Sequence, residues 1–303
     1  MHIKKELLST SREQHNLLIT VLINVFISLV ELIGGLLSNS LALISDALHN
    51  FSDGLALFIT YITLKISKKN ANPKNTFGYK RIQILAALFN AVTLIAICIY
   101  LIFEAWERMI NPQEVKGFSM LVVAGIGLVA NIVGVILLKD FSSANLNIKA
   151  AYLHLIGDTL SSVAVIIGGI LIYFYNIFWI DPVITLLISI YIIRETWQVL
   201  NETYNILMQA SPANLDVKTI RDRLMEVAGV KNIHHVHIWQ LTDQEIHFEG
   251  HIELEEDLLL SKVQKIQEKI NKILIKDFLI NHITLQSEYR RCDNAELISG
   301  NKC

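Results

Sequence analysis

Long apolar stretches dominate the first 200 residues of the chain. Those with few charges lie at 17–37, 41–64, 82–103, 118–138, 150–175 and 180–200. A helix needs about 20 apolar residues to cross a bilayer, so the pattern predicts six transmembrane helices. In the last stretch, Arg194 and Glu195 follow an uninterrupted apolar run at 183–193. These two charges are expected either at the cytosolic interface of the membrane or paired with each other.

Shorter elements with polar faces follow residue 207. The expected elements are a helix at 216–228, strands at 231–241 and 245–254, a helix at 259–278 and a strand at 283–288. The helices show an apolar residue every three or four positions, and the strands alternate. The order αββαβ predicts a small α+β domain with both helices on one face of its sheet. The fold class is thus an α-helical membrane protein with six transmembrane helices and a small αββαβ domain.

The predicted domain organisation has four parts. They are a cytosolic tail at 1–16, a six-helix transmembrane domain at 17–207, the αββαβ domain at 208–290 and a loose polar tail at 291–303. No small-residue cleavage site follows the first residues, so the N-terminus is interpreted as a tail and not as a signal peptide.

The distribution of Lys and Arg predicts the orientation of the chain. These residues concentrate in 1–16, 65–81 and 139–149, whereas the loops on the opposite side hold only Arg108 and Lys116. Short loops rich in Lys and Arg stay in the cytosol. Both termini and the αββαβ domain are therefore expected on the cytosolic side.

Composition supports a membrane protein and argues against a nucleic-acid partner. The chain is 52% hydrophobic with a mean hydropathy of +0.45, which is high for a soluble protein. Its net charge is −2, so there is no overall basic field for nucleic acid. Its three cysteines form no C-x-x-C motif. Membrane lipid is the expected surrounding partner.

One short motif, L-H-x-x-x-D, occurs twice inside the apolar stretches. The first copy contains His49 and Asp53, and the second contains His154 and Asp158. Residues four apart share one helix face, and ionisable groups inside a membrane usually serve a function. A lone histidine or aspartate there often only bonds a neighbouring helix, but the duplication at identical spacing argues for more. Two facing pairs would offer two nitrogens and two oxygens, a set that suits tetrahedral Zn2+, with Co2+, Fe2+ or Cd2+ as weaker candidates.

Asp46 lies one turn before His49 on the same predicted helix. Two roles remain open for it: it helps protons to enter the site, or it only accepts hydrogen bonds from neighbouring helices.

Four motifs together carry a family resemblance. They are SDALHNFSDG at 45–54, FGYKR at 77–81, the second H-x-x-x-D, and HHVHIWQL with HITLQSE at 234–241 and 282–288. With these motifs the chain resembles the zinc-exporting branch of the cation diffusion facilitator family. The resemblance implies a homodimer in which each protomer exchanges a cytosolic metal ion for protons. It also implies a transport site at His49, Asp53, His154 and Asp158, where the histidine at the first position favours Zn2+ over Cd2+.

In this family the cytosolic domain resembles a copper chaperone and often binds regulatory zinc. The resemblance implies His234, His251 and Glu288 as ligands, and His282 as a further one. Strand alternation instead places His234 on the same inward face as Val236 and Ile238. His235 and His237 therefore remain alternative ligands, and solvated strand histidines without metal remain a third possibility.

The predicted function is divalent metal efflux, as a Zn2+/H+ antiporter with a regulatory cytosolic metal site. The alternatives are a broader metal range that includes Cd2+, Co2+, Fe2+ and Mn2+, or a passive or importing transporter. A membrane-embedded metalloenzyme is a remote alternative, since it needs an open water position on the metal and the chain has no H-E-x-x-H motif. The chain is therefore predicted not to be an enzyme. Its 139–149 segment lacks the histidine-rich insert of many eukaryotic members of that family, so the resemblance implies a bacterial inner-membrane protein.

Overall fold

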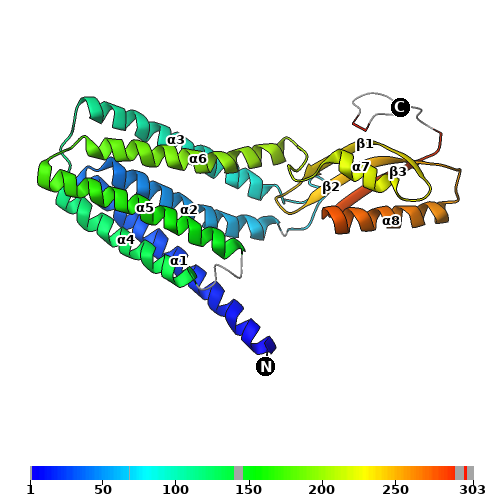
Figure 1. The fold of residues 1–303 in the computed structure, drawn as a ribbon, viewed down its shortest axis with the longest axis horizontal. Helices are drawn as coiled ribbons and strands as arrows, with labels where there is room; N and C mark the ends of the chain where they lie inside the picture. Colours follow the sequence, from blue (N-terminus) through cyan, green and yellow to red (C-terminus); the bar gives the residue numbers. More distant parts are fainter. Residues whose placement is uncertain (1, 68, 140–145, 291–296, 299–303) are drawn as a thin grey trace. The chain divides into compact units, whose positions relative to one another are not determined.

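The protein, in a computed structural model, folds into two compact units. The first contains Met1–Ile62 and Ala86–Leu200, and the second contains Thr63–Leu85 and Asn201–Cys303. The structure describes residues 2–67, 69–139, 146–290 and 297–298 (Figure 1). Most of the predicted C-terminal tail therefore lies outside the described residues, as do Met1 and the side chains of the predicted N-terminal tail.

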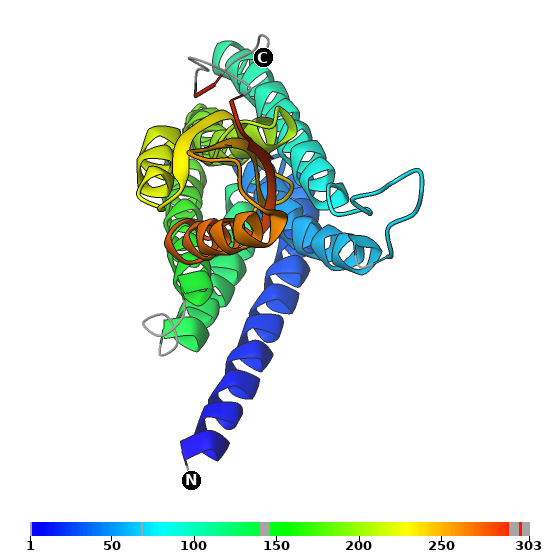
Figure 2. The ribbon, with the colours of Figure 1, turned by 90° about the vertical axis from the view of Figure 1, so that its right-hand side faces the viewer.

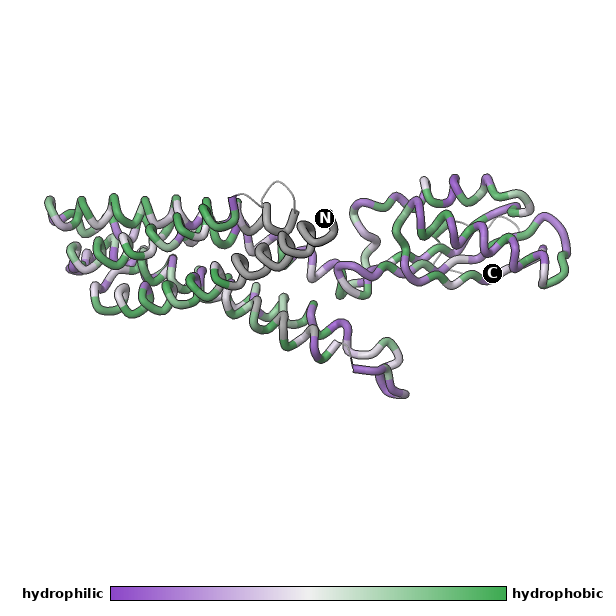
Figure 3. Tube along the Cα trace, turned by 90° about the horizontal axis from the view of Figure 1, so that it is seen from below, coloured by the Kyte–Doolittle hydropathy of each residue, from purple (hydrophilic) through white to green (hydrophobic). Residues whose placement is uncertain are grey.

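Six long helices make up the first unit, and one end of three of them belongs to the second. They are α1 (His2–Ser38), α2 (Leu41–Ser67), α3 (Ile82–Ile110), α4 (Gly117–Lys139), α5 (Leu146–Tyr175) and α6 (Ile180–Leu207). Four of them, α3 to α6, are long and apolar enough to cross a membrane, and a shorter apolar segment lies at Leu22–Ser38 in α1. α2 carries Asp46, His49 and Asp53, which lower its hydropathy. Figure 3 shows the hydrophobic character of these helices. The structure thus contains a membrane helical domain with at least four apolar spans.

The helices bury a common apolar core and expose further apolar residues outward. α4 packs along α5 and along α1 (Figure 1). Met120, Val165 and Ile172 are fully buried between the helices. Phe89 and Phe103 are exposed on the outer surface, which is the side that lipid chains cover in a membrane.

Polar side chains join neighbouring helices inside this unit. The Asn50 amide of α2 donates to Glu31 of α1 at 3.4 Å, and the Asn131 amide of α4 donates to the Ser162 hydroxyl of α5 at 3.2 Å. Gly127 allows the α1–α4 contact, because a Cβ atom there would overlap the Glu31 carboxylate. Such bonds between helices stabilise their packing where no water is available.

A buried carboxylate holds the start of α2 against the start of α6. Asp181 accepts a hydrogen bond from the Ser40 hydroxyl at 2.5 Å. It also accepts hydrogen bonds from the backbone N–H groups of Leu41 and Ala42 at 2.8 and 3.3 Å. These N–H groups belong to the first turn of α2, where a helix has no internal acceptors for them and favours a negative charge. The contact therefore positions α2, and with it His49 two turns later.

The second unit contains a three-stranded sheet and two further helices. Its elements are α7 (Val217–Met225), β1 (Val230–Gln240), β2 (Ile246–Leu254), α8 (Leu260–Phe278) and β3 (His282–Glu288). β2 lies in the middle, antiparallel to β1 and parallel to β3. The observed order αββαβ agrees with the predicted one. α7 and α8 share one apolar core with the sheet (Figure 2).

Local sequence explains the helix ends in this unit. Asp216 caps α7 by accepting hydrogen bonds from the backbone N–H groups of Lys218 and Thr219. Gly229 adopts a φ of +94° between α7 and β1, a conformation that side chains disfavour. Of the predicted loose tail, Leu297 packs against the core, and its carbonyl accepts a hydrogen bond from the Val236 N–H at 2.9 Å.

Candidate metal centres

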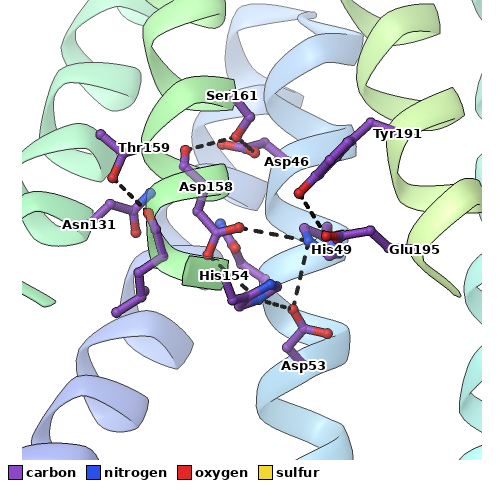
Figure 4. A network of polar contacts seen from close by, with 12 residues as sticks. Asp46, His49, Asp53, Asn131, His154, Asp158, Thr159, Ser161, Tyr191 and Glu195 are labelled. Carbon is purple, nitrogen blue, oxygen red and sulfur yellow. Dashed lines mark hydrogen bonds and ion pairs between the residues drawn. The ribbon is translucent and has the colours of Figure 1, made fainter. Parts of the chain in front are cut away.

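α2 and α5 bring the two H-x-x-x-D pairs together. Figure 4 shows the four side chains pointing toward one another. His154 Nε2 lies 2.8 Å from Asp53 Oδ2 and 3.7 Å from Asp158 Oδ2. His49 Nε2 lies 3.8 Å from each of the two carboxylates, and the two imidazole rings are 5.4 Å apart. His49, Asp53 and His154 can each offer one atom so that all three lie within 4.8 Å of one another, and Asp158 lies beside both histidines.

Three buried donor atoms of this cluster lack a hydrogen-bond partner among the described residues. His49 is buried, and among the residues that the structure describes neither of its ring nitrogens has a hydrogen-bond partner. The same holds for Asp158 Oδ2. Leaving a buried polar atom unpaired costs about 1–3 kcal/mol, and more for a charged group. A divalent cation that accepts these lone pairs would offset that cost, so the donor set fits Zn2+.

A hydrogen-bonded serine connects Asp46 with the second helix of the cluster. The Ser161 hydroxyl lies 2.5 Å from Asp46 Oδ1 and 2.9 Å from the backbone carbonyl of Asp158 (Figure 4). Asp46 thus fixes the position of α5 relative to α2. This contact is the second of the two roles that the sequence leaves open for Asp46; the proton-entry role stays a prediction.

A cavity of about 410 Å³ reaches the cluster from one side. Besides His49, Asp53 and His154, its lining includes Asn90 of α3 and Glu195 of α6. The lining residues of α2 lie toward the end of that helix, and those of α3 lie near its start. The loop that joins these two helix ends is predicted to be cytosolic. At the other ends of the same helices the Asp181 contacts hold α2 against α6. The cavity therefore extends from the cluster toward the side predicted to be cytosolic.

Sequence reasoning did not assign Glu195 to the site. The sequence leaves two positions open for it, the membrane interface or a pair with Arg194. In the structure its carboxylate accepts a hydrogen bond from the Tyr191 hydroxyl at 2.7 Å and lines the cavity. The sequence does show that Glu195 is a charged residue within an apolar stretch, and such a residue usually has a function. It does not show which side chains lie next to Glu195 in the folded protein.

A second group of potential ligands lies on the sheet. The Glu288 carboxylate is 3.4 Å from His234 Nε2 and 3.1 Å from His251 Nδ1. His234 and Glu288 are buried, and His251 is half-buried. One atom from each of the three residues can be chosen so that all lie within 4.8 Å of one another. The set of two imidazoles and one carboxylate suits a metal ion.

His234 is buried, as strand alternation predicts, but it does not share a face with Ile238 as expected. The pairing of β1 with β2 shifts register between His234 and His237, and His235 adopts a φ of +52°. Such a β-bulge inserts one extra residue and changes the face on which side chains lie. His234 is thereby placed beside His251, with the two rings 5.3 Å apart. His235 also lies close, with its ring 4.7 Å from that of His251.

His282 lies apart from this group. It pairs in register with His247, and the two ring centroids are 4.5 Å apart. The buried His247 ring also stacks on Trp239 and meets the edge of Phe77. The structure therefore places His282 in an aromatic cluster, at the opposite end of β3 from Glu288.

We expect His247 to make the second unit less stable in acid. Burial, with a smaller effect from the neighbouring His282, lowers the pKa of His247 below its usual value of about 6.5. As the pH falls, the unfolded chain binds a proton at this ring before the folded chain does, so stability decreases. Thermal unfolding measured from about pH 7.5 to about pH 5.5 should show a smaller loss in His247→Gln than in the unchanged protein. His237→Gln, at an exposed strand position, is the control. Equal losses in all three proteins would contradict the assignment.

Comparison with known proteins identifies the family of this chain. Residues 17–208 match the family of cation efflux transmembrane domains, and residues 212–290 match the cytoplasmic domain of cation efflux proteins. The zinc transporter ZitB of Pectobacterium atrosepticum is 38% identical over 289 residues, which cover 94% of this chain and 88% of the relative. The metal cation efflux system protein CzcD of Cupriavidus metallidurans is 36% identical, covering 88% of this chain and 84% of the relative. A cadmium, cobalt and zinc/H(+)-K(+) antiporter of Bacillus subtilis is 39% identical, covering 89% and 88%. The resemblance predicted from the motifs is confirmed, and the chain belongs to the cation efflux, or cation diffusion facilitator, family.

Proposed function

We propose that this protein exports divalent metal ions, with Zn2+ as its main substrate, in exchange for protons. The observation that carries the proposal is the cluster of His49, Asp53, His154 and Asp158 at the end of a cavity. The names of the relatives agree, since they include zinc transporters and a cadmium, cobalt and zinc/H(+)-K(+) antiporter. Members of this family are transporters, which removes the metalloenzyme alternative.

Competition between metal ions and protons for the same ligand atoms explains how metal export is coupled to proton movement. Zn2+ binds neutral imidazole and ionised carboxylate, so a metal ion and protons exclude each other from His49, Asp53, His154 and Asp158. When the cluster faces the cytosol through its cavity, it releases protons and binds the ion. When it faces the opposite side, protons replace the ion. A proton gradient can therefore drive export without ATP, and the chain has no phosphate-binding glycine loop.

A broader metal range is the second candidate function. Imidazole and carboxylate ligands also bind Co2+, Cd2+, Fe2+ and Mn2+, and geometry is one of the features that select among such metals. The printed names of two relatives include cadmium and cobalt or metal cations in general. Two imidazoles with two carboxylates suit tetrahedral Zn2+ best, which is why we rank zinc first.

We further propose six transmembrane spans within residues 17–207, with both termini in the cytoplasm of a bacterial cell. α1 and α2 supply the two spans beyond the four apolar ones, since each is longer than the roughly 20 residues that a span needs. The cytosolic position of residues 208–290 is supported by the matched family of cytoplasmic domains. That family's name also denotes a dimer, and a homodimer is consistent with the small core of this unit.

The group at His234, His251 and Glu288 is proposed as a regulatory metal site, with His235 as a neighbouring alternative ligand. Zinc bound there would draw the two cytosolic domains of a homodimer together and promote transport. His251→Ala should then remove the zinc-dependent closure, measured as the distance between spin labels on the two domains. Metal affinity at this site should fall by more than the roughly 10–100-fold that loss of a supporting partner costs. If the two domains of His251→Ala still approach each other when zinc is added, a regulatory site at these residues would be excluded.

Flux measurements in proteoliposomes test the transport proposal. A zinc indicator inside the vesicles should report uptake that needs an acidic interior and stops when an ionophore collapses the pH gradient. Co2+, Cd2+, Fe2+ and Mn2+ under the same gradient would rank the metals. Zinc movement that follows only its own gradient would instead indicate a passive channel.

A further inference from the structure

Arg81 is a cation without a counter-charge. It lies at the end of the loop between α2 and α3, directly before Ile82. Within the described parts of the chain no carboxylate pairs with its guanidinium, and its Nε–H group is buried without an acceptor. A buried donor on a charged group is costly to leave unpaired. The site therefore favours binding of an anion.

A cavity of about 330 Å³ lies beside this arginine within the second unit. Its lining includes Asn75, Phe77, Lys80, Arg81, Gln209 and Trp239. The loop contributes two cations, and the aromatic and amide side chains provide a flat apolar surface with additional polar groups. Guanidinium groups bind phosphate through two parallel hydrogen bonds, which is stronger than binding by a single point charge.

The charge in this cavity amounts to a single positive unit. Lys80 Nζ binds both oxygens of Glu245, at 2.9 and 2.6 Å, so these two charges compensate each other. Arg81 remains as the uncompensated charge. A ligand with one negative charge, such as a phosphodiester, would balance it.

The position of the cavity along the chain favours a lipid over a soluble anion. Phe77 of its lining is 54% exposed, and Arg81 directly precedes α3, which is one of the apolar spans. A ligand held at Arg81 therefore lies at the end of a span, where lipid headgroups also lie. Basic pockets at the cytosolic ends of membrane helices commonly bind acidic headgroups.

We propose that this cavity binds the headgroup of an anionic phospholipid, with Arg81 holding the phosphodiester. A zwitterionic lipid brings its own cation and would leave the positive charge of the site uncompensated, so the site should prefer phosphatidylglycerol over phosphatidylcholine. The bound lipid would hold the first turns of α3, and the same helix supplies Asn90 to the cavity of the transmembrane cluster. This inference needs only membrane insertion and is independent of which metal is carried.

Native mass spectrometry of the full-length protein titrated with phosphatidylglycerol tests the proposal. Arg81→Gln should lose the tightest-bound lipid, with affinity at least about 10-fold lower, because a charge-assisted bidentate contact is removed. Arg81→Lys should bind the lipid with an affinity between those of the unchanged protein and of Arg81→Gln. Lys69→Gln removes the same charge from an exposed position of the same loop outside the cavity, and it should bind as the unchanged protein does. Equal losses in Arg81→Gln and Lys69→Gln would overturn the proposal, since they indicate general attraction to the loop.

Competition experiments on the unchanged protein keep the proposal testable even where Arg81→Gln fails to fold. Phosphatidylglycerol should bind more tightly than phosphatidylcholine, and millimolar inorganic phosphate should not displace it. Equal binding of the two lipids would overturn the proposal. Displacement by inorganic phosphate would also overturn it, in favour of a soluble anion. None of these readouts depends on zinc, so failure of the transport proposal would leave them unchanged.

Discussion

His154→Ala is expected to abolish proton-driven zinc uptake into proteoliposomes. The change removes one of two nitrogen donors and leaves Asp53 without its partner at 2.8 Å. Loss of a group that merely supports a metal ligand lowers affinity by about 10–100-fold, so loss of the ligand itself should lower it by more. Transport should fall with it, because the same donors bind the protons that drive export. The measurement is the initial rate of zinc uptake under an imposed pH gradient.

A matched histidine variant separates this effect from a general loss of folded protein. His237, one of the two alternative ligands from the sequence, is exposed and belongs to neither ligand group among the described residues. His237→Ala should therefore transport zinc at the rate of the unchanged protein. Undiminished uptake in His154→Ala would show that the ion does not bind between α2 and α5. Equal losses in both variants would point to destabilisation instead.

Acidification from about pH 7.5 to about pH 5.5 is expected to weaken zinc binding at the transmembrane cluster. Zinc binds neutral imidazole and ionised carboxylate, so protons compete with the metal ion for the same nitrogen and oxygen atoms. Affinity is thus high at neutral pH and lost as the pH falls.

Isothermal titration of a His234→Ala/His251→Ala background measures this dependence without the cytosolic cluster. Adding His49→Ala should weaken binding and also make the remaining pH dependence less steep, because one titrating ligand is gone. A zinc affinity that stays constant over this pH range would argue against direct competition between metal ions and protons.

The helical part of the molecule was largely predictable because its signals are local. Apolar stretches of span length predict the helices, and the four-residue spacing in His49/Asp53 and His154/Asp158 puts each pair on one helix face. The loop positions place both pairs at a similar depth on two antiparallel helices, and this predicted that the pairs meet. The cavity and the role of Glu195 were not predictable, because they depend on how α3 and α6 pack against α2.

The cytosolic sheet was predictable in its elements and not in its register. Alternation assumes a regular strand, and the bulge at His234–His237 breaks that assumption. Which histidines meet across strands depends on the parallel pairing of β2 with β3, which sets His247 against His282. A shift by one residue would change every pair, and no local pattern specifies that pairing. The unpaired state of Arg81 likewise became visible only with the loop folded beside β1 and β2.

X-ray absorption at the zinc edge of a His234→Ala/His251→Ala variant tests the central claim most directly. The account predicts about one zinc ion per chain, held by two imidazole nitrogens near 2.0 Å and two carboxylate oxygens. The signal should disappear when His154→Ala is added. A variant that retains no zinc, or a zinc ion coordinated without imidazole, would contradict a metal site between α2 and α5.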